Sequence, residues 1–176
     1  MQIFRTDRSA IVTAHQLDDR RLSKAIVEAA QVVSTAVWKT NCYLAESLYS
    51  KGKIYLPSHE SHPIVKWTAE KPCNKLYVCD YGWMLCYEFQ YRFLKMHKSK
   101  SVFRNLRELI FNVYVNEGFK GQPNFTTHHQ HVDNVYEAYQ KELCHKWRTL
   151  DKQEPKWTRR EVPNFYIDYL SAFYDA

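Results

Sequence analysis

The chain has 176 residues, a formal net charge of +6 at pH 7 and 45% hydrophobic residues. This length suits one domain with a sizeable core, and the scarcity of Gly (4) and Pro (6) argues against a turn-rich all-β fold. The basic charge favours a polyanionic partner. No apolar run approaches the roughly 18 residues that cross a bilayer, so no membrane partner is expected.

The first half of the chain predicts four helices, because capping residues precede runs with helical periodicity. Ser9 can cap the first helix, and Asp18 or Asp19 can cap the second. A loop that contains Gly52 separates the third helix from the fourth. The expected spans are 10–15, 19–41, 43–50 and 64–70.

The second half predicts a long aromatic helix, a shorter one, a loop and a last helix that Asp133 could cap. The chain beyond Asp151 reads as a basic, aromatic tail. The expected helical spans are 74–98, 102–115 and 133 to about 150, with a loop over 117–131. We therefore expect an all-α fold of five to seven helices, packed as one compact domain over residues 1–176.

Glu28 lies at the edge of the apolar stripe of the second helix, one turn after Lys24 and two turns after Arg21. Two interpretations stay open. The i, i+4 pair can be an ordinary ion pair on a helix surface. Alternatively, Glu28 can be a partly buried acid that stabilises a sugar cation or moves protons.

A second group of charges combines Glu88, Arg92 and Lys95 at i, i+4, i+7 spacing, which predicts one helix face. This pattern fits a solvated face, or a face that holds a phosphate among aromatic residues. His62 precedes Pro63, which keeps it out of the helical conformation. It can therefore cap the next helix or face a site.

Three histidines lie within residues 128–131, but neighbouring side chains point in different directions and no HExxH or CxxC pattern accompanies them, so no metal is expected. The tail interleaves cations with an aromatic residue, as in proteins that follow a phosphate backbone and stack on bases. In a second interpretation, the aromatic residues fix the tail to the core, and the two interpretations are compatible. The tail residues concerned are Lys156, Trp157, Arg159 and Arg160.

The order of these motifs resembles the pyrimidine-dimer DNA glycosylase/AP lyase family, which comprises small helical repair enzymes, and a group of uncharacterised phage proteins. Three blocks, which together span about half of the chain, carry the resemblance. They are Asp19-x-x-Leu22 with Glu28, His62-Pro63-x-x-x-Trp67, and Glu88 with Arg92-Phe93 and His97-Lys98-Ser99.

The resemblance implies an enzyme that flips a nucleotide out of DNA. In the family, the N-terminal amine attacks the sugar C1′, displaces the base and forms a Schiff base, and β-elimination then nicks the strand. Glu28 matches the family's essential glutamate by position. Gln2 is too large for ordinary removal of the initiator methionine, so the amine here would be that of Met1, with Lys24 as a second candidate nucleophile.

The chain also departs from the family beside the glutamate. Arg21 replaces a family histidine, and Val27 and Gln31 stand where the family has phosphate-binding arginines. The shared scaffold is therefore compatible with other N-glycosidic chemistry, such as the removal of a different modified base.

We therefore expect a DNA-processing enzyme that cleaves the N-glycosidic bond of a damaged or modified pyrimidine, without a metal or organic cofactor. The alternatives are a non-catalytic nucleic-acid-binding protein and an N-glycosidase or transferase that acts on free nucleotides. Free cysteines in an odd number suggest the cytoplasm, that of a bacterial host if the chain is phage-encoded. The expected catalytic residues are Met1, Lys24 and Glu28, and the expected nucleic-acid contacts are Arg21, His62, Trp67, Glu88, Arg92, Lys95, Lys156, Arg159 and Arg160.

Overall fold

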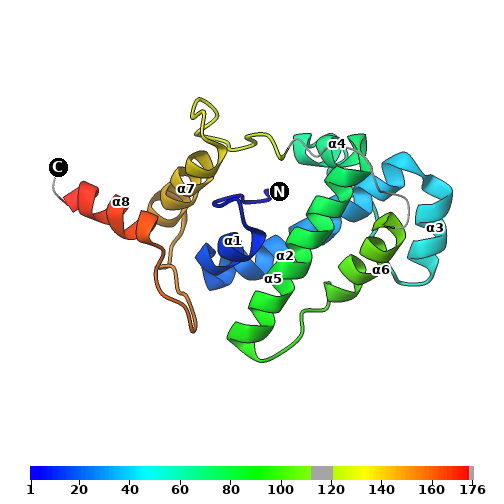
Figure 1. The fold of residues 1–176 in the computed structure, drawn as a ribbon, viewed down its shortest axis with the longest axis horizontal. Helices are drawn as coiled ribbons and strands as arrows, with labels where there is room; N and C mark the ends of the chain where they lie inside the picture. The colour runs from blue at the N-terminus through cyan, green and yellow to red at the C-terminus, as the bar shows by residue number, and fades with distance from the viewer. Residues whose placement is uncertain (112–120, 175–176) are drawn as a thin grey trace.

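The computed structural model describes residues 1–111 and 121–174, and every regular element in these two segments is helical (Figure 1). The prediction of a single all-α domain is confirmed. One helix more is present in the described segments than our upper count, because the tail contains α8. The elements are α1 (Ala10–Gln16), α2 (Asp19–Thr40), α3 (Cys42–Ser50), α4 (Pro63–Glu70), α5 (Pro72–Phe93), α6 (Lys100–Phe111), α7 (Val135–His145), the π-helical turn η1 (Lys146–Leu150) and α8 (Asn164–Tyr174).

The two longest helices, α2 and α5, pack against each other at the centre of the molecule, with α1, α4 and α6 around them. The apolar stripe of α2, including Leu22, Ile26 and Val33, is fully buried. A Cβ atom at Gly82 would lie 2.2 Å from the ring of Phe103, which is itself buried. Glycine at this position therefore lets α6 approach α5 closely.

Capping side chains set the starts of several helices, as expected. Ser9 caps α1, and Asp18 caps α2 by accepting from the backbone N–H of Arg21. His62 caps α4, which is one of its two expected roles. Asn134, rather than Asp133, caps α7, so this prediction was wrong by one residue.

The prediction for the long central helix was wrong at its C-terminal end. The helix ends at Phe93 because Leu94 adopts a left-handed conformation, with φ of 54°, and donates its N–H to the carbonyl of Gln90. Lys95 and His97 therefore follow the helix and do not extend its face. The predicted helix over 102–115 is present as α6 up to residue 111, and its last positions lie outside the described residues.

The C-terminal tail is fixed to the rest of the molecule. Trp157 donates from Nε1 to the carbonyl of Gln16 at 3.0 Å, and Thr158 donates from Oγ1 to Asp19 at 2.6 Å. The rings of Trp147 and Trp157 meet edge to face at 5.1 Å. The tail thus follows the interpretation in which its aromatic residues pack on the core.

The first eight residues form neither helix nor strand, and three of them, Ile3, Phe4 and Thr6, are buried in the interior. Ile3 and Phe4 are buried, the side chain of Gln122 donates to the carbonyl of Ile3 at 2.9 Å, and Gln140 donates to the carbonyl of Thr6 at 2.9 Å. Figure 1 shows this segment between the α2–α5 pair and α7. These contacts hold the start of the chain in place beside α2 and α7.

All five cysteines are free thiols. Among the described residues, no helix has both the length and the apolar character needed to cross a membrane.

Candidate active site at the amino terminus

A pocket of about 340 Å³ opens beside the start of the chain. Five parts of the molecule that are distant in sequence form its walls: the first four residues, the first turns of α2, the start of α4, the loop before α7 and the turn η1. The lining residues are Met1, Gln2, Phe4, Arg20, Arg21, Lys24, Ala25, Glu28, His62, Phe125, Thr127, Lys146, Leu150 and Asp151.

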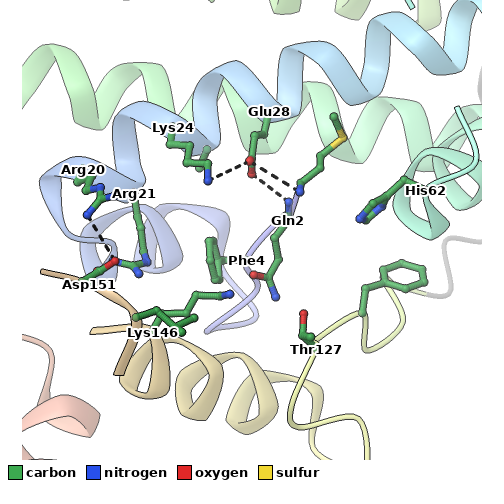
Figure 2. A pocket seen from close by; sticks show the side chains of 14 residues that line it. Gln2, Phe4, Arg20, Arg21, Lys24, Glu28, His62, Thr127, Lys146 and Asp151 are labelled. Carbon is green, nitrogen blue, oxygen red and sulfur yellow. Dashed lines mark hydrogen bonds and ion pairs between the residues drawn. The ribbon is translucent and has the colours of Figure 1, made fainter. Parts of the chain in front are cut away.

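Glu28 lies at the centre of a small network in this pocket (Figure 2). Its Oε2 accepts the backbone N–H of Gln2 at 2.9 Å. Its Oε1 lies 3.9 Å from the α-ammonium nitrogen of Met1 and 3.6 Å from Nζ of Lys24. The side chains of Met1 and Glu28 are 2% and 14% exposed, while both residues as a whole are partly exposed, so the amine and the carboxylate meet at the wall of the pocket.

The pocket carries more positive than negative groups. Its cationic groups are the Met1 amine and the side chains of Arg20, Arg21, Lys24 and Lys146, against the carboxylates of Glu28 and Asp151. All five take part in ion pairs: the Met1 amine and Lys24 with Glu28, both arginines with Asp151, and Lys146 with Glu142 at 3.1 Å. Lys24 is 70% exposed at the pocket edge. Such a surplus attracts an anion such as a phosphate.

His62 faces the pocket from α4, on the side opposite Lys24 (Figure 2). Its Nδ1 accepts the backbone N–H of Ile64 at 3.3 Å. Burial lowers the pKa of His62, and the positive charges of the α-amine and His59 lower it further, while Glu28 raises it. The imidazole is therefore neutral at pH 7.

The chemistry available in this pocket is that of an amine beside a carboxylate. An amine is a nucleophile toward an electron-poor carbon, and an adjacent carboxylate can take the proton that the amine releases. Within the described segments, no group of three or more His, Cys, Asp or Glu side chains is arranged to hold a metal ion.

The structure separates Glu88 and Arg92 from this pocket. The Arg92 side chain is fully buried; it donates to Glu88 at 2.6 Å, to Asp19 at 3.0 Å and to backbone carbonyls at the end of α1, including that of Leu17 at 2.8 Å. Arg160 donates two further hydrogen bonds to Glu88. This network joins α1, α2, α5 and the tail. Its residues therefore pair with groups inside the protein, whereas the sequence analysis expected them to contact a phosphate.

The pKa of Glu88 is shifted by opposing effects. Burial raises it, but hydrogen bonds from Arg160 and Arg92 outweigh the burial and hold the pKa below its usual value. His15 lies 3.4 Å from the same carboxylate. Glu88 is therefore a charged structural group.

The remaining expected nucleic-acid contacts also lie outside the pocket. Trp67 is buried and packs edge to face with Phe125, a pocket residue, at 6.4 Å. Lys95 is exposed just after α5, with its Nζ 5.7 Å from the Phe89 ring. Lys156 and Arg159 are exposed in the tail, and Arg159 donates to the carbonyl of Tyr91. Of the nine expected contacts, only Arg21 and His62 line the pocket.

Sequence reasoning brought Met1, Lys24 and Glu28 to one site, but it missed several residues that complete the walls. Most lie in loops or beyond 120, where no motif pointed to the pocket. One signal was available: the apolar residues Ile3 and Phe4 close to the amino terminus, which indicate a buried start of the chain. The missed residues are Gln2, Phe4, Arg20, Ala25, Phe125, Thr127, Lys146, Leu150 and Asp151.

Comparison of the chain with protein-family models, with curated proteins and with solved structures found no match. The assignment of a function therefore depends on the geometry of the pocket.

Proposed function

We propose that this protein cleaves the N-glycosidic bond of a damaged or modified pyrimidine nucleotide in DNA, with the α-amine of Met1 as nucleophile and Glu28 as the carboxylate that assists it. The observation that carries the proposal is the pair formed by this amine and the partly buried Glu28, 3.9 Å apart, in a pocket with surplus positive charge. An ordinary surface ion pair would not need the walls that five separate parts of the chain build around this one.

The proposed reaction uses these groups in turn. The unprotonated amine of Met1 forms a bond to C1′ while the bond from C1′ to the base breaks, and the electron pair of that bond leaves with the base. The amine then gives a proton to Glu28. As the sugar ring opens, O4′ takes this proton, and the nitrogen lone pair forms the Schiff base.

The cations at the pocket edge support a DNA substrate. Lys24 and Arg20 have exposed side chains; in Figure 2 Lys24 lies beside the Glu28 carboxylate, and Arg20 lies farther away, beside Asp151. They are placed to contact the phosphates that flank a flipped nucleotide.

Borohydride trapping tests the proposal. DNA with a single abasic site, and separately DNA with a thymine dimer, would be incubated with the protein and borohydride, which reduces a Schiff base to a stable amine. We expect a covalent protein–DNA product for the wild type and for the control Glu46→Gln, an exposed glutamate on α3. Glu28→Gln should form it at least about 100-fold more slowly. Equal trapping by Glu28→Gln would overturn the assignment of Glu28.

A second candidate, cleavage of free nucleotides, is favoured by one observation. Arg92 and Arg160, two of the cations expected to bind DNA, are engaged within the protein. If wild-type protein releases base from pyrimidine mononucleotides and neither binds nor traps DNA, this second candidate replaces the first.

A further inference from the structure

His62 is held in one tautomer by the helix that it caps. Its Nδ1 accepts the backbone N–H of Ile64 at 3.3 Å, so this nitrogen presents its lone pair and carries no hydrogen. In a neutral imidazole the hydrogen must then be on Nε2. The cap of α4 thereby leaves His62 with one N–H donor and no free acceptor.

The surroundings keep His62 uncharged. The N-terminus of a helix carries partial positive charge, which disfavours a cation at its cap. The other titratable or charged groups that act on His62 are the Met1 amine, His59 and Glu28, and only Glu28 favours the charged form. His62 therefore offers the pocket a neutral N–H group and does not act as a base.

A second polar group in the same pocket lacks a partner. The Nε2 atom of Gln2 is buried and makes no hydrogen bond within the described structure. The Gln2 side chain extends into the pocket between Glu28 and Thr127 in Figure 2, while His62 faces the pocket from another wall. Burying an amide donor without a partner is unfavourable, and a ligand with carbonyl oxygens would satisfy it.

Phe125 adds an apolar lining group near the His62 wall, and its ring contacts that of Trp67. The pocket thus combines charged groups, among them the amine, Glu28 and Lys24, with neutral ones, the side chains of His62, Gln2 and Phe125. A nucleotide likewise combines a charged sugar-phosphate with a neutral base.

We propose that the neutral Nε2–H of His62 donates a hydrogen bond to a ring carbonyl oxygen of the departing pyrimidine. When the bond from C1′ to N1 breaks, its electron pair spreads from N1 onto this oxygen, and the hydrogen bond stabilises the developing negative charge. No proton leaves His62; the departing base takes its proton from water afterwards. This inference rests on the proposed N-glycosidic chemistry and assigns the group that assists the leaving base.

Base excision and Schiff base formation at an abasic site can be measured separately. The comparison distinguishes a role of His62 toward the leaving base from a structural role. An abasic site has no base to expel, so Schiff base formation there does not need His62. Asparagine is also a good helix cap, but its shorter side chain does not carry an N–H to the Nε2 position. His62→Asn thus removes the donor and keeps a cap on α4. His59→Asn is the matched control, because His59 is exposed in the same loop at φ of 52°, a conformation that asparagine accepts.

The experiment measures excision of uracil, 5-fluorouracil and a thymine dimer from DNA, together with borohydride trapping on abasic DNA. We expect His62→Asn to slow excision of uracil or of the dimer about 100-fold or more and to trap abasic DNA like the wild type. The loss should shrink to about tenfold or less for 5-fluorouracil, whose anion is the more stable leaving group. His59→Asn should match the wild type throughout.

Several results would overturn the inference: full excision by His62→Asn, an equal loss with uracil and 5-fluorouracil, or no excision of any of the three bases by the wild type. Failure of the wild type to trap abasic DNA would count instead against the proposed function. A long-range proton–nitrogen NMR spectrum adds a test without substrate. It should show His62 as the neutral Nε2–H tautomer at pH 7, and an Nδ1–H or doubly protonated ring would contradict the assignment.

Discussion

At the scale of single residues, two pairs with the same sequence spacing serve different purposes. Lys24–Glu28 and Glu88–Arg92 are both i, i+4 pairs, so the sequence treats them alike. In the structure, the two pairs differ in the groups that contact them from other parts of the chain. The chain's own amine reaches Glu28 in an open pocket, whereas Arg92 meets backbone carbonyls from α1 in the interior.

Arg92 is the residue whose loss should destabilise the protein most clearly. Arg92→Ala leaves Glu88 buried with one partner fewer and leaves the carbonyls at the end of α1 without donors. We expect the free energy of unfolding, measured with urea, to fall by about 3–5 kcal/mol. Lys95→Ala, which changes an exposed cation three residues later, should alter it by less than about 0.5 kcal/mol. Equal stability of the two variants would refute this structural role.

At the scale of elements, local signals predicted most of the helices, and the errors have local causes. Ser9 and Asp18 act through neighbours along the chain, so their caps were predictable. The early end of α5 depends on Leu94, which adopts a left-handed conformation that its sequence does not favour. The helix α8 was missed because its aromatic residues were interpreted together with the basic tail before it.

The loop before α7 is held to that helix by Glu142, which is fully buried. Its carboxylate accepts the backbone N–H of His128 at 3.0 Å and lies 3.2 Å from His129 and 3.1 Å from Lys146. Burial alone would raise the pKa of Glu142, but these hydrogen bonds and the lysine charge lower it to about 2. This network positions Thr127 and Lys146 in the pocket wall.

The lowered pKa of Glu142 predicts acid sensitivity of this part of the fold. A carboxyl whose folded-state pKa is depressed stabilises the protein above its ordinary pKa of 4.5, and that contribution is lost as the pH falls toward 2. Across this window, Glu142 should account for a loss of about 3 kcal/mol in the free energy of unfolding.

Urea unfolding between pH 2 and pH 7 measures this contribution. In Glu142→Gln, the decrease in the free energy of unfolding between pH 4.5 and pH 2 should be smaller by about 3 kcal/mol. At neutral pH this variant should be less stable than the wild type. Glu137→Gln changes an exposed glutamate on the same helix, paired only with Lys141 among the contacts described, and should keep the wild-type profile. The same pH profile in wild type and Glu142→Gln would contradict the prediction.

At the scale of the whole molecule, the pocket depends on contacts between distant parts of the chain. The sequence supplied Glu28 and its candidate nucleophiles, because a motif marks the glutamate and a chain has one amino terminus. The wall residues Phe125, Lys146 and Asp151 could not be predicted from the sequence, because they reach the site only through the long-range packing of α7 and the tail. Spacing along one helix carries no information on such contacts.

The charge distribution predicts a salt-dependent interaction with DNA through the pocket edge. Binding to duplex DNA with a tetrahydrofuran abasic analogue would be measured by fluorescence anisotropy at several salt concentrations. We expect Lys24→Gln to weaken binding and to reduce the slope of log affinity against log salt by about 1, because one phosphate contact is lost. Lys39→Gln, at the far end of α2, should keep the wild-type slope. An unchanged slope in Lys24→Gln would place the DNA elsewhere.

The most direct test of the central claim is to identify which nitrogen carries the borohydride-trapped adduct. Trypsin digestion of the trapped product, followed by mass spectrometry, distinguishes the peptide Met1–Arg5 from peptides that contain Lys24. The α-amine of Met1 lies in the pocket beside Glu28, whereas the Lys24 side chain is mostly exposed at the pocket edge, so we predict the adduct on the α-amine of the first peptide. An adduct on Lys24, or no adduct on either peptide, would contradict the account.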